Sequence, residues 1–231
     1  HDPEKGFADG RVIAVGIKER KGTRNSPTVL NAAFFDTQFW DGRVITLEEQ
    51  AKQPIINPNE MGMPSHDALV EKISNISEYK TAFQAVFGTE KITIDHIARA
   101  IASFERTLIS FNAPFDRFIA GEKDAISASA QRGWKLFQGK ARCVTCHEFN
   151  RSYPFFTNNK FHNVGVAMKG KDFEFLARKA ASSGADPSAL VQEEASAELG
   201  RYLVTKEPKD IGAFKTSGLR NIALTAPFMH D

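Results

Sequence analysis

The sequence predicts a mainly α-helical protein, because apolar residues recur at helical spacing in three segments and few stretches alternate with a period of two. We expect one long helix over about 67–87 and a second over about 93–110. A third helix is expected over about 127–137, with Ser127 as its N-cap and Gly139 as its C-terminal stop. The side chains expected to face the core of the first two helices are Leu69, Ile73, Ile76, Phe83 and Phe87, then Ile94, Ile97, Ile101, Phe104 and Leu108.

The segments between these helices predict long irregular loops with short helical pieces. Asp9-Gly10 and Asp41-Gly42 are turn signals. Short helices are expected over 28–31 and 46–52, and Thr46 with Glu49 fits a capping box at the start of the second. The charged, Ala/Ser-rich stretch 169–203 is expected to be an excursion with helical parts.

Composition limits the class of protein. The 231 residues are 42% hydrophobic and 25% charged, which is typical of a soluble globular chain with one or two domains. A net charge of +2 is too balanced to indicate a nucleic-acid-binding surface. No apolar run approaches 18 residues, so no membrane span is expected.

The two cysteines lie in one motif, Cys143-Val144-Thr145-Cys146-His147, so a disulfide scaffold is excluded. C-x-x-C-H is the attachment signature of haem c: both thiols form thioethers to the porphyrin edge and His147 supplies the proximal iron ligand. A redox dithiol would favour a βαβ context, and a zinc site would need further ligands at short spacing. A helix followed at once by this motif is how a cytochrome c domain begins, and covalent attachment of haem implies a compartment outside the cytoplasm.

Further short segments form an ordered series along almost the whole chain. They are HDPEKGFADG (1–10), RNSPTVLNA (24–32), FWDGR (39–43), LEEQA (47–51), NPNEMG (57–62), FHNVG (161–165) and LRNIALTAPFMHD (219–231). By this series the chain resembles the bacterial di-haem cytochrome c peroxidases and the MauG-like proteins. The resemblance implies two cytochrome c-like haem domains, a peroxidatic domain over 1–118 and an electron-transfer domain over 119–231.

The ends of the chain fit the same resemblance. Family members carry a first C-x-x-C-H motif immediately before the Asp-Pro segment, so His1 is expected to be the ligand of a first haem iron, with its two cysteines further upstream. The distal ligand of the second haem is a Met, or a Tyr in MauG-like members, and is expected beyond residue 231. Met229 does not have that position.

The resemblance also implies the catalytic residues. Glu60 aligns with the distal acid–base glutamate, Gln50 with a distal-pocket glutamine and Pro54 with a proline that shapes the same pocket. Trp40 aligns with the tryptophan between the two haems. An isolated Glu is usually a solvated loop carboxylate and a Trp is usually a core residue, and these readings stay open. Trp134 is expected to be a core residue.

A calcium ion between the haem domains is a further implication. Asn25 aligns with its side-chain ligand, and Thr225 and Pro227 align with backbone carbonyl ligands, in keeping with the preference of calcium for oxygen donors. The alternative is that Asn25 only caps a turn. His162 and His230 are expected to make supporting hydrogen bonds.

One departure from the family pattern affects the expected activity. Peroxidases that need reductive activation place a His before the Asn-Ser-Pro-Thr segment, whereas Ile17–Arg24 contains none, and His66 and His96 are expected to be surface or structural residues. We therefore expect a five-coordinate first haem iron in the oxidised resting protein.

The expected function is that of a periplasmic oxidoreductase of the cytochrome-c peroxidase type. It would reduce hydrogen peroxide with electrons from a small c-type cytochrome or cupredoxin. The alternatives are a MauG-like enzyme that oxidises residues of a partner protein and a non-catalytic electron-transfer cytochrome c. Family members are often homodimers.

Overall fold

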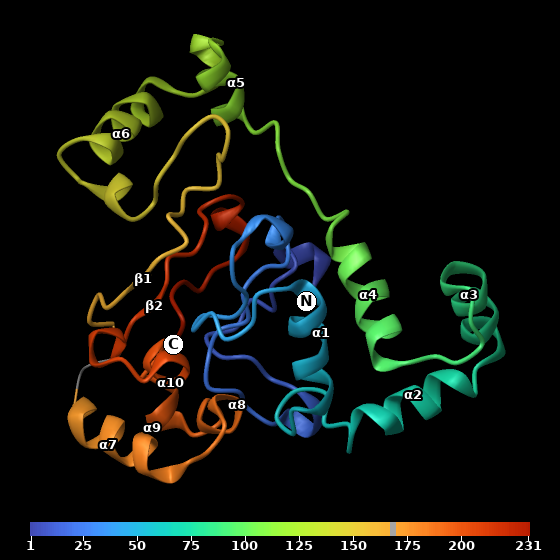
Figure 1. Ribbon diagram of the computed structural model, residues 1–231. Helices are drawn as coiled ribbons and strands as arrows, with labels where there is room; N and C mark the ends of the chain where they lie inside the picture. The colour runs from blue at the N-terminus through green and yellow to red at the C-terminus, as the bar shows by residue number, and fades with distance from the viewer. Residues whose placement is uncertain (167–169) are drawn as a thin grey trace.

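A computed structural model describes residues 1–166 and 170–231 and shows a mainly helical chain with long irregular connections, which confirms the predicted class (Figure 1). Strands β1 (Phe161–His162) and β2 (Phe214–Lys215) pair antiparallel, with Phe161 opposite Lys215. The helices are α1 (Leu47–Ile56), α2 (His66–Ser74), α3 (Ser77–Phe87), α4 (Ile94–Glu105), α5 (Pro114–Ala120), α6 (Ala128–Gln138), α7 (Phe173–Ser183), α8 (Pro187–Leu190), α9 (Glu194–Ala197) and α10 (Tyr202–Thr205).

Helix α1 begins where the capping box was predicted. The Thr46 hydroxyl accepts a hydrogen bond from the backbone N–H of Glu49, and the Glu49 carboxylate accepts one from the N–H of Thr46. The buried face of α1, which includes Leu47 and Ala51, packs against α4. The helix runs four residues further than predicted, to Ile56, and Pro54 lies in its last turn. The α1–α4 pair therefore supports the loop that follows α1.

The single helix predicted over 67–87 is wrong, because the structure has two helices, α2 and α3, separated at Asn75 and Ile76. Ile76 has extended backbone angles and therefore cannot continue the helix. A straight helix of that length would span about 30 Å. The break lets both helices turn their apolar faces onto one cluster with α4. That cluster contains Phe83, Ile92 and Ile97, with Leu69, Val70, Ile73, Phe87 and Ile101 packed against it.

Helix α4 starts after Thr93 as predicted but ends at Glu105, five residues early. Phe104, expected to face inward, is 60% exposed. The early end has a tertiary cause: Asn31 donates its N–H to Leu108 O at 2.9 Å, and its side chain pairs with the backbone of Ser110. The helix predicted over 28–31 is also wrong, since a 3-10 turn at Ala32–Phe34 follows Asn31 instead.

The C-terminal half contains two helical groups. Helices α5 and α6 project from one end of the molecule, and α7–α10 form the opposite end (Figure 1). Helix α6 begins after Ser127 and ends before Gly139, as predicted. The excursion over 169–203 has its predicted helical parts, and its own core includes Leu190, Leu199 and Leu203; residue 169 lies outside the described residues.

Within the described residues, no helix is both long enough and apolar enough to cross a membrane.

Candidate functional site

The C-x-x-C-H motif forms a tight turn directly after α6. Gly139 ends the helix, and Arg142 adopts left-handed backbone angles (φ 56°) that are unusual for a residue with a side chain. The chain then makes a 3-10 turn at Cys143–Thr145, and the N–H of His147 donates to Cys143 O at 2.9 Å. Both thiols are free and half-buried. This turn brings the two sulfurs and the imidazole onto one short stretch of chain.

The two predicted iron ligands share a hydrogen-bond pattern. Nδ1 of His147 lies 2.9 Å from the carbonyl oxygen of Phe156, and Nδ1 of His1 lies 2.9 Å from the carbonyl oxygen of Phe7. A carbonyl only accepts, so Nδ1 carries the proton in each neutral ring and Nε2 keeps the lone pair. Metal-binding histidines are commonly oriented in this way. Residues 143–147 therefore fit a covalently attached haem, and His1 is oriented as an iron ligand would be.

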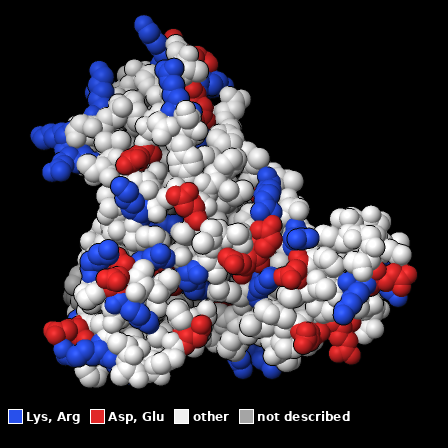
Figure 2. Space-filling model, in the orientation of Figure 1, with Lys and Arg blue, Asp and Glu red and all other residues white. Residues whose placement is uncertain are grey.

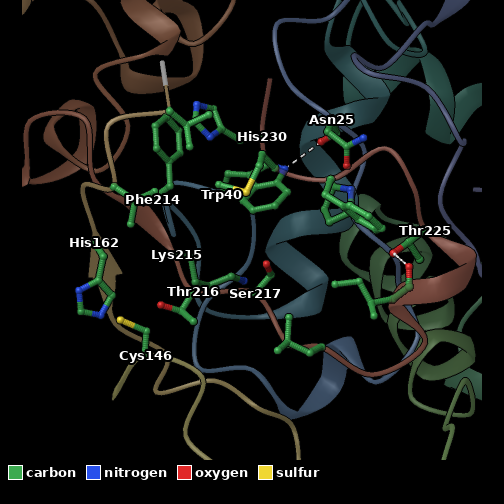
Figure 3. A pocket seen from close by; sticks show the side chains of 18 of the residues that line it. Asn25, Trp40, Cys146, His162, Phe214, Lys215, Thr216, Ser217, Thr225 and His230 are labelled. Carbon is green, nitrogen blue, oxygen red and sulfur yellow. Dashed lines mark hydrogen bonds between the residues drawn. The ribbon is translucent and has the colours of Figure 1, made fainter. Parts of the chain in front are cut away.

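An open cavity of about 240 Å³ lies beside the motif and is shared by both halves of the chain (Figure 3). Cys146 lies on one side of the cavity and Asn25 and Trp40 on the other, and His147 also lines it. Thr225 and Pro227 also contribute to its wall. The structure thus brings together the predicted haem-attachment, inter-haem and calcium residues around one space.

Trp40 is fixed in the cavity wall by polar and aromatic contacts. Its indole N–H donates to Asn25 O at 2.9 Å, a bond drawn in Figure 3. The ring meets His230 edge-on at 6.2 Å, and His230 stacks on Phe214 at 3.5 Å between ring centroids. His230 also lies 3.0 Å from the buried carboxylate of Glu198. These contacts orient Trp40 in the wall of the cavity.

Asn25 is held by its two nitrogen atoms, which leaves its side-chain oxygen for another partner. Its amide nitrogen donates to Arg11 O at 2.7 Å, and its backbone N–H donates to His230 O at 2.8 Å. The Asn25 side chain is buried. Thr225 and Pro227, whose backbone carbonyls are the other predicted calcium ligands, line the same cavity. Oxygen donors of this kind suit calcium.

Glu60 lies in the loop after α1, away from the cavity wall. Its carboxylate accepts a hydrogen bond of 2.5 Å from the side-chain amide of Asn57. Burial raises the pKa of the Glu60 carboxyl above its ordinary value, although the Asn57 amide and the charge of Arg43 oppose that shift. The structure therefore places the Glu60 carboxyl in a half-buried site. A solvated loop carboxylate would have no such surroundings and no raised pKa.

Gln50 and Pro54 lie one turn apart on α1 and so share one face of the helix. Pro54 O accepts a hydrogen bond from the N–H of Met61, the residue after Glu60, at 3.1 Å. The end of α1 and the Glu60 loop are therefore directly joined.

Gly16 packs against the loop that carries Glu60, on the side away from Pro54. The N–H of Ile17 donates to Glu60 O at 2.7 Å, and a Cβ at Gly16 would lie 2.2 Å from Asn59 O and 2.5 Å from the Cα of Glu60. Real side chains do not approach backbone this closely, so only glycine allows this contact. Sequence analysis missed this residue, since a glycine in a loop carries no signal of what packs against it.

We expect Gly16→Ala to displace the loop that carries Glu60. The new methyl group would collide with backbone atoms of Asn59 and Glu60, which cannot move aside by a change of rotamer as a side chain can. The free energy of unfolding should fall by about 1–3 kcal/mol, and any reaction that depends on Glu60 should slow by at least about tenfold. Denaturant unfolding and the rate of that reaction measure the two effects. Gly22→Ala in the same loop is the control, because its Cβ would make only ordinary contacts with Ala14. Equal effects at both positions would contradict this role of Gly16.

Two charged groups beside Trp40 were also missed. Asp41 is fully buried, and Arg24 and Arg43 reach its carboxylate at 2.7 and 3.1 Å. Burial alone would raise the pKa of Asp41, but the two guanidinium groups hold it below its ordinary value. Arg43 also donates to Gln53 of α1 at 2.7 Å, so this cluster links Trp40 to the helix that precedes Glu60.

The second missed group is Lys215, which lines the cavity and donates to Thr37 O at 2.6 Å. Burial lowers the pKa of Lys215 to about 8, although Asp41 and Asp36 oppose the shift. No periodicity or motif in the sequence indicates that these charges are buried.

Comparison with known proteins agrees with this geometry. The family model described as Di-haem cytochrome c peroxidase matches residues 1–124. The chain is 39% identical to the methylamine utilization protein MauG of Methylorubrum extorquens and 36% identical to the cytochrome c peroxidase Ccp of Escherichia coli. All of this chain is covered in both cases, but only 57% and 44% of those proteins. The chain therefore spans about half the length of these curated relatives.

Solved structures show the same fold. The crystal structure of a MauG-like protein associated with microbial copper homeostasis superposes with a TM-score of 0.77 at 30% identity, covering 100% of this chain and 65% of that one. A helix-rich chain with a C-x-x-C-H turn and an oriented histidine defines a c-type haem protein. More particularly, the chain belongs to the di-haem cytochrome c peroxidase family, which also includes the MauG proteins.

Proposed function

We propose that this chain is part of a di-haem enzyme that reduces hydrogen peroxide to two water molecules, using two protons and two electrons from a small redox protein. The observation that carries the proposal is the setting of Glu60. Its carboxylate is half-buried and bound to Asn57, and its backbone packs against Gly16, in a chain that also carries the ligands for a c-type haem. A pure electron carrier needs no such acid–base group.

Haem iron, when bound, supplies the redox centre at which the oxygen–oxygen bond is broken. Glu60 takes the proton from the oxygen of peroxide that is to be activated and returns it to the oxygen that leaves as water. Burial favours this exchange because it brings the pKa of the carboxyl closer to neutral pH. Gln50 and Pro54 would shape the space that peroxide enters, and His1 would be the protein ligand of the first haem iron.

Cys143, Cys146 and His147 would hold the second haem, which would supply the centre that accepts electrons from the donor, and Trp40 would lie on the route to the first haem. In support, Trp40 lines the same cavity as Cys146 and His147, and its indole N–H is bound to Asn25 O. Residues 1–118 would form the peroxidatic domain and 119–231 the electron-transfer domain. Asn25, Thr225 and Pro227 would bind calcium where the two meet, and covalent haem attachment favours a periplasmic location.

The test is peroxide consumption by the haem-loaded full-length protein, with a reduced c-type cytochrome as the electron donor. We expect two donor molecules to be oxidised for each peroxide consumed. Donor oxidation that stops after the few equivalents needed to reduce the haems, whether or not peroxide is present, would overturn the proposal and favour an electron-transfer cytochrome.

A MauG-like activity is the second candidate, supported by the sequence between Ile17 and Arg24, which contains no His able to block the first iron. We expect the oxidised holoprotein to show a high-spin signal in electron paramagnetic resonance without prior reduction. A purely low-spin spectrum would contradict this. Peroxide-dependent oxidation of a partner protein, without rapid turnover of a reduced cytochrome, would favour the MauG-like activity.

A further inference from the structure

The part of the chain that attaches the second haem carries charge of only one sign. Between Asp124 and Glu148 the sequence contains four basic residues and no acidic residue. The four are Arg132, Lys135, Lys140 and Arg142, and the side chains of all four are exposed. The rest of the chain is nearly balanced, since the net charge of the whole is only +2. The basic stretch is therefore a local feature and not a reflection of composition.

Packing of α6 fixes which way these charges point. Trp134 and Phe137 face inward, where Trp134 meets Phe115 at 4.9 Å and Phe149 at 5.4 Å between ring centroids. Since helix positions on the opposite face must then point outward, Arg132 and Lys135 lie on the outer surface. Leu136 is 53% exposed beside them.

The charges on this outer face are not neutralised by ion pairs. Among the described residues, none of the four basic side chains lies within 4 Å of a carboxylate, whereas Arg24, Arg43, Arg106 and Arg220 all do. Figure 2 shows several Lys and Arg side chains projecting from the α5–α6 end of the molecule, at the upper left, together with some Asp and Glu side chains. An unpaired positive field of this kind attracts and orients an approaching anionic surface.

This face also lies next to the point where electrons would enter. Arg142 directly precedes Cys143, and Lys140 lies three residues before it. Thioether bonds to Cys143 and Cys146 would fix one edge of a porphyrin beside these residues, and electron transfer between proteins requires a short distance to such an edge. An exposed apolar residue within a charged rim suits a small, short-lived complex of under about 1,200 Å².

We propose that the outer face of α6 and the turn after it, formed by Arg132, Lys135, Leu136, Lys140 and Arg142, is the docking surface for a small redox protein whose electron-transfer site is surrounded by acidic side chains. This inference rests on the proposed function, because it names the kind of partner that delivers the electrons. A donor ringed by lysines would be repelled at the same surface.

The experiment measures electron entry without peroxide. The oxidised, haem-loaded full-length protein is mixed rapidly with one of two reduced cytochromes c of similar potential, one with an acidic rim around its haem edge and one with a lysine rim. At low salt the acidic-rim cytochrome should react about 10- to 1,000-fold faster, and its rate constant should fall steeply as salt is added. Equal rate constants, or a faster lysine-rim donor, would overturn the proposal.

Charge reversal locates the effect on the surface. The double variant Lys135→Glu and Lys140→Glu should lower the rate constant for the acidic-rim donor at least about tenfold and raise it for the lysine-rim donor. The matched control is Lys72→Glu with Lys91→Glu, two exposed lysines on α2 and on the loop before α4, and it should leave both rate constants unchanged. The salt dependence of the unaltered protein tests the same field without any variant. An equal loss in both double variants would contradict the assignment.

Failure of the docking surface and failure of the proposed function give different results. If peroxide is consumed with a small neutral reductant but reduction by the two cytochromes does not differ, only the docking surface is wrong. If the acidic-rim donor reduces the protein rapidly but no reductant supports peroxide consumption, only the peroxidase function is wrong.

Discussion

Replacing Glu60 by Gln is expected to lower peroxide turnover by about 10²- to 10⁴-fold while both haems remain bound. The variant keeps the size of the side chain and an oxygen that can accept the hydrogen bond from Asn57, which lies 2.5 Å from Glu60 in the structure. What it removes is the group that accepts and returns a proton. Steady-state peroxide consumption measures the loss, and the Soret absorption shows that haem is retained.

The pH dependence gives a second readout of the same residue. Burial raises the pKa of Glu60, so the carboxylate form is lost at a higher pH than for an exposed Glu. Turnover of the unaltered protein should therefore fall as the pH is lowered through that raised pKa, and the variant should lack this limb. A raised pKa also means that ionised Glu60 costs folding free energy above that pH, so Glu60→Gln should be at least as stable as the unaltered protein at neutral pH.

The control for Glu60 is the same substitution at Glu71, an exposed residue of α2. Glu71→Gln should change neither turnover nor its pH profile. Unchanged turnover in Glu60→Gln would remove Glu60 from the mechanism, and so would an equal loss in both variants.

Replacing Asp41 by Asn should produce the largest loss of stability, about 3–5 kcal/mol of the free energy of unfolding. The carboxylate is fully buried between Arg24 and Arg43, and Asn would leave two buried guanidinium groups without a counter-charge. Denaturant unfolding measures the loss. Because Asp41 directly follows Trp40, fluorescence should also report a change in the surroundings of that indole.

The sign of the pH effect follows from the lowered pKa of Asp41. Burial opposes the shift, but Arg24 and Arg43 outweigh it. The stability that this carboxylate contributes is therefore fully present above its unfolded pKa and is lost as the pH falls through its lower folded pKa. The difference between Asp41→Asn and the unaltered protein should shrink in acid.

The matched control is the half-exposed ion pair of Glu48 and Arg106, whose atoms approach to 2.7 Å. Since solvent screens that pair, Glu48→Gln should cost less than about 1 kcal/mol. An equal loss of unfolding free energy in Asp41→Asn and Glu48→Gln would show that burial does not determine how much the Asp41 ion pairs contribute to stability.

Elements with a local cause could be predicted from the sequence. The capping box at Thr46 and the caps of α6 at Ser127 and Gly139 were predicted correctly, because cap hydrogen bonds join residues close in the chain. The break between α2 and α3 was not, since the apolar stripe continues across Asn75 and Ile76, whereas in the structure both helices pack with α4 on one cluster. The early end of α4 likewise depends on Asn31, more than 70 residues away in the chain.

For the candidate site, the sequence by itself determined the chemistry of the haem attachment, because two thiols and an imidazole at fixed spacing form one local turn. It also identified Glu60, Trp40 and Asn25 through the resemblance to a family. Only the tertiary structure decided that Glu60 is half-buried beside Gly16, that Asp41 is enclosed by Arg24 and Arg43, and that Trp40 and His147 line one cavity. The physical reason is that burial and electrostatic environment are created by contacts between residues far apart in the chain, which no local pattern encodes.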